Sequence, residues 1–132
     1  MPETTPVRTI YLPVLRSLLP SMHELFDFPD PSQIKGQREV TTVPAQALFF
    51  LNSRLATDAA HNAAQRLLDD ATLRTDEARV TRAYVALFGR EPSPDESKDA
   101  RSFLSGMTDA PAARWSALVQ ALMASSEFRY VW

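Results

Sequence analysis

The chain has 132 residues, a length that fits one domain able to bury a core without disulfides or a structural metal. Its formal net charge of −2, with the two signs interspersed, argues against nucleic-acid binding, which normally uses a basic patch. The absence of cysteine excludes disulfides, zinc–thiolate sites, thiol nucleophiles and covalent haem attachment.

Apolar residues occur in short groups along the whole chain. No group approaches the roughly 20 apolar residues that a transmembrane helix needs, and no signal-peptide pattern opens the chain. There is no sustained period-two alternation, and only three glycines are available for hairpins. We therefore predict an all-α fold, a compact bundle of about five to seven helices with one long Pro/Asp-rich loop.

Residues 1–7 are mostly polar and contain two prolines, so we predict a disordered or extraneous N-terminus followed by a single helical domain over residues 8–132. The next stretch is apolar, but Pro13 interrupts it and favours a short helix that ends at or before Pro20. Ser21 is a suitable cap for a second short helix.

Residues 27–36 read DFPDPSQIKG, a composition typical of a loop. In the simplest interpretation, Asp27, Asp30 and Ser32 make local turn and capping bonds. Long ordered loops often carry function, however, so these three residues and Arg38 form the candidate ligand loop. A calcium site is disfavoured because such loops use more acidic residues, with a glycine at the tight turn.

The longest helical signal lies between about residues 44 and 68. Pro44 suits the first turn, and Thr41 or Thr42 is the natural N-cap. One apolar stripe with spacings of three or four is predicted to face the core. It consists of Leu48, Leu51, Leu55, Ala59, Ala63 and Leu67.

Two further features of this helix bear on its packing. The alanines of its second half would allow a neighbouring helix to approach closely. Asn52 and Ser53 leave open an alternative in which the segment breaks into two helices, because both side chains compete for backbone hydrogen bonds.

Thr75 is predicted to cap the next helix, with Asp76 and Glu77 in its first turn. Its buried face is predicted to consist of Val80, Tyr84, Leu87 and Phe88. Gly89 follows where a left-handed residue would end the helix.

The sequence Ser93-Pro94-Asp95-Glu96 predicts a capping box that opens another helix. This helix should run to about Ser105 and bury Phe103 and Leu104.

A last long helix should begin near Ala110-Pro111 with Asp109 or Thr108 as its cap. Its predicted core face is Trp115, Leu118, Val119, Leu122 and Met123. Ser125 or Ser126 should then start a final turn that packs Phe128, Val131 and Trp132 against the domain.

No catalytic, metal or cofactor constellation is evident. His23 and His61 lie far apart in the sequence and have no second ligand at metal-binding spacing. His61 is predicted to be solvated or at a helix interface. There is no Gly-x-Ser-x-Gly elbow and no glycine-rich phosphate loop. We predict no catalytic residue, no metal and no cofactor for this segment.

Several blocks of sequence nevertheless resemble one family. They are IYLPVLR (10–16), LFDFPDPS (25–32), REVTTVPAQALFFLN (38–52) and, further on, YVALFGREPSPDE (84–96) followed by SSEF (125–128). Together they resemble the C-terminal part of the planctomycete cytochrome-associated domain of unknown function number fifteen fifty-three. Residues 80–128 also resemble, more weakly, a helical repeat found beside secreted calcium-binding and phycobilisome-linker-like modules.

The resemblance implies a segment of a larger exported protein of the periplasm or cell surface, with neighbouring domains, including c-type cytochrome domains, as partners. It carries over no catalytic residue, and the chain lacks a Cys-x-x-Cys-His motif. We expect a non-catalytic structural or docking module. The alternative is a ligand-binding or hydrolytic site formed by residues 27–39 together with a preceding part of the parent protein.

Overall fold

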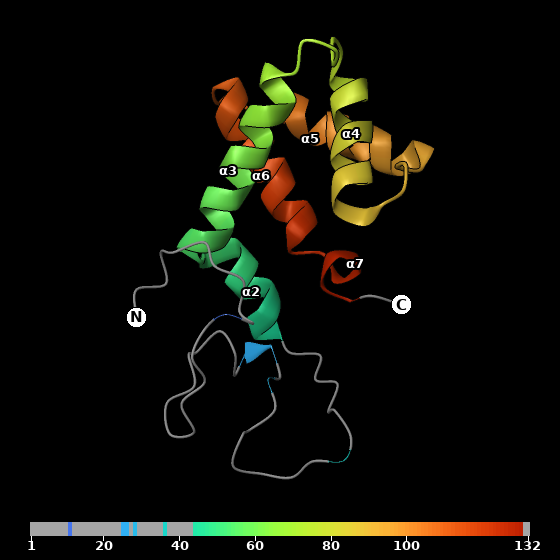
Figure 1. Ribbon diagram of the computed structural model, residues 1–132. Coiled ribbons are helices and arrows are strands. Elements are labelled where there is room, and N and C mark those ends of the chain that lie inside the picture. Colours follow the sequence, from blue (N-terminus) through green and yellow to red (C-terminus); the bar gives the residue numbers. More distant parts are fainter. Residues whose placement is uncertain (1–10, 12–24, 27, 29–35, 37–43, 131–132) are drawn as a thin grey trace. The chain divides into compact units, whose positions relative to one another are not determined.

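The computed structural model describes residues 11, 25, 26, 28, 36 and 44–130 (Figure 1). The packing divides the chain into two units, residues 1–46 and residues 47–132. Within the described residues there are six helices and no strand, which confirms the all-α prediction. These helices are α2 (Pro44–Asn52), α3 (Arg54–Asp69), α4 (Asp76–Phe88), α5 (Pro94–Gly106), α6 (Pro111–Met123) and α7 (Ser126–Arg129).

Several predictions fall outside the described residues. They concern the N-terminus 1–7, the short helix from Pro13, the caps at Thr41 or Thr42, most of the loop 27–36, and Val131 and Trp132. In the first unit, Leu25 is helical and its carbonyl accepts a hydrogen bond from Gln46 Nε2 at 3.0 Å. The single domain over residues 8–132 stays a prediction.

The predicted long helix is divided at Ser53. Pro44 begins α2 as expected, and α2 and α3 meet at a bend (Figure 1). Ser53 is extended, with φ −75° and ψ 139°, and its Oγ accepts a hydrogen bond from Ala56 N at 3.2 Å. Of the two alternatives at Asn52-Ser53, the break is therefore the one observed.

A side chain from α6 helps to fix this break. Gln120 Nε2 donates to the carbonyl oxygens of Phe50 and Leu51, at 3.1 and 3.0 Å. In an uninterrupted helix these carbonyls would accept the N–H groups of Arg54 and Leu55. Gln120 thus supplies the hydrogen bonds that the break removes.

The core face of α3 is only partly the predicted stripe. Leu67 is buried and Ala63 is half-buried against the core, as predicted, but Leu48, Leu51 and Leu55 are 55%, 47% and 45% exposed, and Ala59 is exposed. The other buried residues are Ala56, Ala60 and Ala64, and the prediction missed them because each of these alanines directly follows another apolar residue. Two apolar columns about 100° apart therefore run along this helix. Only the packing against α6 distinguishes them.

Helix α3 packs most extensively against α6, which lies between α3 and α4 in Figure 1. Alanine side chains allow two helix backbones to approach closely, as predicted for this segment. The α6 side of the seam carries Trp115, Leu118, Val119 and Met123, all buried. Leu122 is half-buried and packs at the edge of the same core.

The caps of α4 and α5 confirm the local predictions. Thr75 Oγ1 accepts from Ala78 N, and Gly89 ends α4 in the left-handed region at φ 72°. Ser93 and Glu96 form a complete capping box at the start of α5. The core contact is only partly as predicted, because Leu104 is buried but Phe103 is 42% exposed. Phe103 and Leu104 are adjacent apolar residues, so the sequence alone does not show which of the two faces the core.

The start of α6 corrects one prediction. Its N-cap is Ala110, which makes no side-chain capping bond, so neither Asp109 nor Thr108 caps the helix. Pro111 at the first helical position has its φ fixed in the helical range and needs no acceptor for an N–H. The Ala110 carbonyl accepts from the amides of Ala113 and Arg114. The helix can therefore start one residue later than a side-chain cap would place it.

Helix α7 is a single turn capped by Ser125, whose Oγ accepts from Phe128 N at 3.3 Å. The Phe128 ring meets the ring of Phe50 edge-to-face, with centroids 5.5 Å apart. The C-terminal turn is therefore packed on the domain through Phe128, as predicted. In the described part of the chain, no helix has both the length and the apolar composition that a bilayer crossing requires.

Candidate functional site

The four predicted site residues, Asp27, Asp30, Ser32 and Arg38, lie outside the described residues. Of the stretch 27–39, the structure describes Phe28, which is 39% exposed, and Gly36. The ligand loop therefore stays a prediction. Three arrangements of polar or exposed side chains elsewhere in the chain can be assessed as sites.

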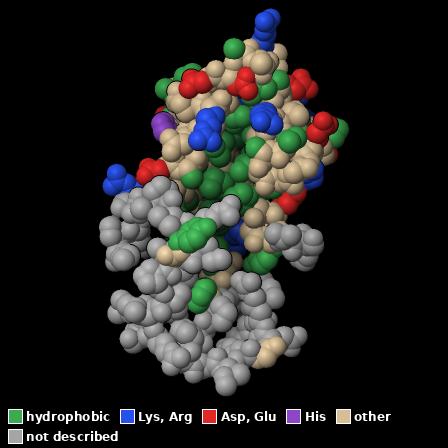
Figure 2. Space-filling model, viewed as in Figure 1, with side chains coloured by type: hydrophobic (Ala, Val, Ile, Leu, Met, Phe, Trp, Pro, Cys, Tyr) green, Lys and Arg blue, Asp and Glu red, His purple; other side chains and the backbone are tan. Residues whose placement is uncertain are grey.

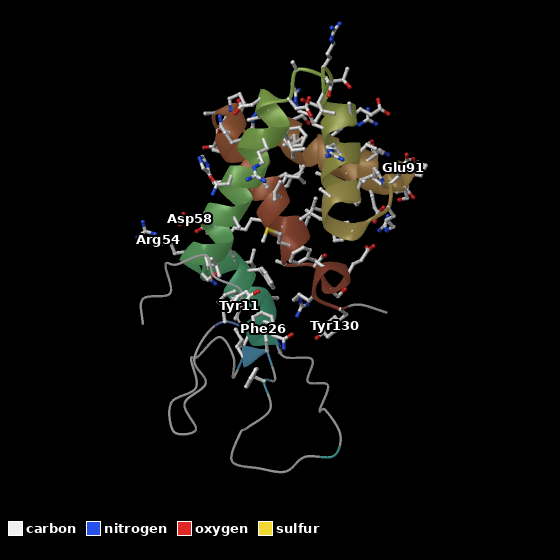
Figure 3. The ribbon with its side chains drawn as sticks, viewed as in Figure 1. Tyr11, Phe26, Arg54, Asp58, Glu91 and Tyr130 are labelled. Carbon is white, nitrogen blue, oxygen red and sulfur yellow. The ribbon has the colours of Figure 1, made fainter. Side chains whose placement is uncertain are left out.

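The first arrangement is an ion-pair cluster around Arg90, the residue that follows the glycine cap of α4. Its Nε and Nη2 donate to the two oxygens of Glu127, at 2.6 and 2.7 Å. Its Nη1 and Nη2 donate to the two oxygens of Glu96, at 2.8 and 2.7 Å. A fifth bond runs from Nη1 to the carbonyl of Glu91, a residue labelled in Figure 3.

These contacts shift the ionisation of all three partners. Hydrogen bonds from Arg90, and then from the Ser93 amide, lower the pKa of Glu96 to about 2. The Arg90 hydrogen bonds also lower the pKa of Glu127, and the hydrogen bonds from both carboxylates raise the pKa of Arg90. The cluster is therefore fully ionised at neutral pH.

The guanidinium of Arg90 also lies over two rings. Its Cζ is 5.7 Å from the centroid of Tyr84 and 5.8 Å from that of Phe88, within the range of cation–π attraction. Burial, and next the charge of Glu96, raise the pKa of the Tyr84 phenol. The cluster thus joins the end of α4 to the starts of α5 and α7.

The cluster has no spare capacity to bind a ligand through its cation. A guanidinium has five N–H donors, and the five bonds of Arg90 use all of them. Sequence reasoning identified Glu96 as a capping residue but missed this network. The signal available was the FGREPSPDE and SSEF wording, which contains Arg90, Glu96 and Glu127.

The second arrangement is a serine–histidine contact between α3 and α6. Ser116 Oγ lies 3.3 Å from His61 Nδ1, and His61 is exposed, in agreement with its predicted place at a helix interface. A nucleophilic serine also needs an oriented base and donors for an oxyanion. Among the described residues, no carboxylate is hydrogen-bonded to His61. What the pair provides in the described structure is a contact between α3 and α6.

The described residues contain no group of three or more His, Cys, Asp or Glu side chains placed to hold a metal ion. A shallow depression of about 450 Å³ lies beside α4 and is lined by Leu73, Ala78, Val85, Glu77 and Arg82, among others. Its apolar floor is wide open, so it does not enclose a ligand as a typical binding pocket does.

The third arrangement is the exposed leucine face of α2 and α3, formed by Leu48, Leu51 and Leu55. Beside it, Arg54 Nε lies 3.7 Å from Asp58 Oδ2, and both side chains point away from the helix into solvent (Figure 3). Large exposed apolar side chains at helical spacing, with charges at their edge, are typical of interaction surfaces. In the view of Figure 2, hydrophobic side chains gather in the centre of the described part and charged side chains lie around them.

Comparison with known proteins places the chain by family only. No curated protein and no solved structure matches it. One family model matches residues 2–104, which is most of the 132 residues. The matched part includes helices α2 to α4 and most of α5. The chain thus belongs to the family described as PSD1: Protein of unknown function (DUF1553).

Proposed function

We propose that this segment is a non-catalytic helical docking module of a larger exported multidomain protein, and that the leucine face binds a neighbouring domain. The observation that carries the proposal is the exposure of Leu48, Leu51 and Leu55 on adjacent helices. Burying a leucine contributes about 1.5–3 kcal/mol relative to leaving it exposed. A neighbouring domain on the same polypeptide would also act at a high effective concentration, so even a small face could hold it.

The proposal is tested with the double variant Leu51→Glu/Leu55→Glu. The 132-residue chain and the remainder of its parent protein would be produced separately and mixed in a calorimeter. We expect the wild-type chain to bind the remainder and the double variant to bind at least tenfold more weakly, because two charges would have to be desolvated in the interface. Both proteins should melt at similar temperatures, since both positions are already solvent-exposed.

The matched control is Phe103→Glu. Phe103 is also a large exposed apolar residue, but it lies on α5, away in sequence from the leucine face. We expect this variant to bind as the wild type does. Equal binding by the double variant and the wild type, or no binding by the wild type, would contradict the proposal.

A c-type cytochrome domain is the neighbour that the family resemblance suggests. Support comes from the sequence blocks that carry the resemblance, and from the exposed charges of Arg54 and Asp58 beside the leucine face. If charges at the rim guide this contact, its affinity should fall between low and moderate salt, because screening shortens the range of electrostatic attraction. A salt titration of the mixture, followed through haem absorbance, measures this. Cell fractionation of the parent protein tests export.

The ligand loop is the second candidate. Its support is that residues 27–39 lie inside the family match and overlap two of the sequence blocks that carry the resemblance. The variant Asp27→Asn/Asp30→Asn should leave the melting temperature of the chain unchanged and abolish binding or activity of the parent protein. A large loss of melting temperature in the absence of ligand would instead assign these aspartates to turn and capping bonds.

A further inference from the structure

The residues between α2 and α3 combine two conflicting patterns. Leu48, Leu51, Leu55 and Ala59 follow the spacing of a single uninterrupted helix, yet the helix is broken between Leu51 and Leu55. Neither Asn52 nor Ser53 forces the break, because both residues are tolerated inside helices. The break therefore depends on a contact from outside the segment, made by Gln120, together with the cap that Ser53 supplies.

Those contacts can be exchanged for helical ones. The carbonyls of Phe50 and Leu51 accept from Gln120 Nε2, and the amide of Ala56 donates to Ser53 Oγ. In a continuous helix the same carbonyls would accept the amides of Arg54 and Leu55, and Ala56 N would donate to the Asn52 carbonyl. Gln120 is half-buried, so water can replace its lost partners.

We infer that the α2–α3 junction is a hinge with two states, a bent form held by Gln120 and a straight form in which residues 44–69 are one helix. The bent form also retains the contact between the rings of Phe50 and Phe128. It is therefore the form adopted by the isolated chain. The straight form would align Leu48, Leu51, Leu55 and Ala59 on one face.

The hinge goes beyond the proposed docking function and does not depend on it. A partner that covers the whole aligned stripe would bind the straight form more tightly and shift the population towards it. In the absence of such a partner, weakening the contacts of Gln120 or Ser53 should also shift the population towards the straight form.

Amide hydrogen exchange measured by NMR tests the hinge on the chain alone. In the bent form, the amides of Arg54 and Leu55 are the first two of α3 and have no acceptor in the preceding turn, so they should exchange without protection. In Gln120→Met, which keeps a long side chain but loses both donors, we expect exchange at these two amides to slow at least tenfold.

The matched control is Gln65→Met on the exposed side of α3, which should leave both amides unprotected. Ser53→Ala provides a second route, because it removes the cap without changing the core, and it decides the matter if Gln120→Met does not fold. Folded variants that still exchange rapidly at Arg54 and Leu55 would overturn the hinge. A loss of protection throughout α2 would likewise overturn it, because Gln120 would then only anchor a helix that frays.

Discussion

At the scale of single residues, Arg90 is the most highly connected side chain of the described structure. It joins two carboxylates, one backbone carbonyl and two aromatic rings. Exposed ion pairs usually contribute little to stability, but networks of bidentate arginine contacts are an exception. The value of this cluster lies in its position, since it fastens three helices at one point.

Arg90→Lys should therefore lower the melting temperature by several degrees. A lysine keeps the charge but cannot make two parallel bonds to each carboxylate, and its ammonium has three donors in place of five. Thermal melts followed by circular dichroism measure the effect. Arg82→Lys is the control, because Arg82 is exposed and makes no ion pair among the described residues. Equal melting temperatures for the two variants would show that the network contributes nothing.

The same cluster predicts an acid-dependent loss of stability. The pKa of Glu96 is about 2 in the folded chain and ordinarily 4.5, so the unfolded chain binds more protons between these values. Stability should therefore be fully present above about pH 4.5 and fall as the pH drops towards 2. The lowered pKa of Glu127 acts in the same direction.

Urea unfolding at a series of pH values measures this slope. Glu96→Gln should reduce the slope below pH 4.5, because the side chain then has no proton to gain. Glu77→Gln, at the opposite end of α4, is the control and should retain it. An unchanged slope in Glu96→Gln would indicate that other carboxylates govern the acid response.

At the scale of elements, the ends of α4 and α5 predict different effects of replacing their glycines. Gly89 has φ 72°, whereas Gly106 at the end of α5 does not have a positive φ, and no atom lies within 4 Å of a Cβ built at either position. Gly89→Ala should lower the free energy of unfolding by about 1–2 kcal/mol, because a side chain is strained in the left-handed region. Gly106→Ala should be neutral or slightly stabilising. Urea unfolding of both variants distinguishes them.

The seam between α3 and α6 predicts a contrast between adjacent alanines. Ala60 is 1% exposed in the seam, and Ala59 beside it is exposed. Ala60→Leu should destabilise the chain by about 1–3 kcal/mol through overpacking, whereas Ala59→Leu should have little effect. If urea unfolding showed that Ala59→Leu destabilises the chain and Ala60→Leu does not, the core face of α3 would be the stripe that the sequence predicted.

The elements show which features of the fold can be predicted from the sequence. Caps at Thr75, Gly89 and Ser93 were predicted correctly because a cap depends on a few adjacent residues. The core phase of α3 and the exposure of Phe103 were not, because pairs of adjacent apolar residues allow either column to face inward. That choice is made by a distant helix.

The candidate sites follow the same rule. The ion-pair cluster escaped prediction because Glu127 lies 37 residues from Arg90, and no local pattern brings the two together. The clamp from Gln120 to the α2 carbonyls spans a still longer stretch of sequence. The sequence thus suggested a break at Ser53 but could not decide between one long helix and two shorter ones.

At the scale of the whole molecule, the family match and the core have different extents. The match ends at residue 104, within α5, yet α6 supplies Trp115, Leu118, Val119 and Met123 to the core. A chain limited to residues 1–104 would leave the alanine face of α3 without its partner helix. The fold therefore needs residues beyond the matched part.

We accordingly expect a chain of residues 1–104 to show no cooperative thermal transition. A chain of residues 1–130, which keeps α6 and α7, should melt cooperatively, as the complete chain should. Circular dichroism melts of the three chains test this. A cooperative melt of residues 1–104 near the temperature of the complete chain would mean that α6 is dispensable.

The alanine seam also restricts which sequences related proteins can tolerate. Where the backbones of α3 and α6 approach closely, positions 56, 60 and 64 should accept only alanine, glycine or serine. The neighbouring exposed positions 55 and 59 should vary freely in size, unless they bind a partner. An aligned set of relatives would then show a column of invariably small residues beside a column of changeable ones. If leucine were also invariant at the exposed position 55, this would indicate that the surface takes part in an interaction.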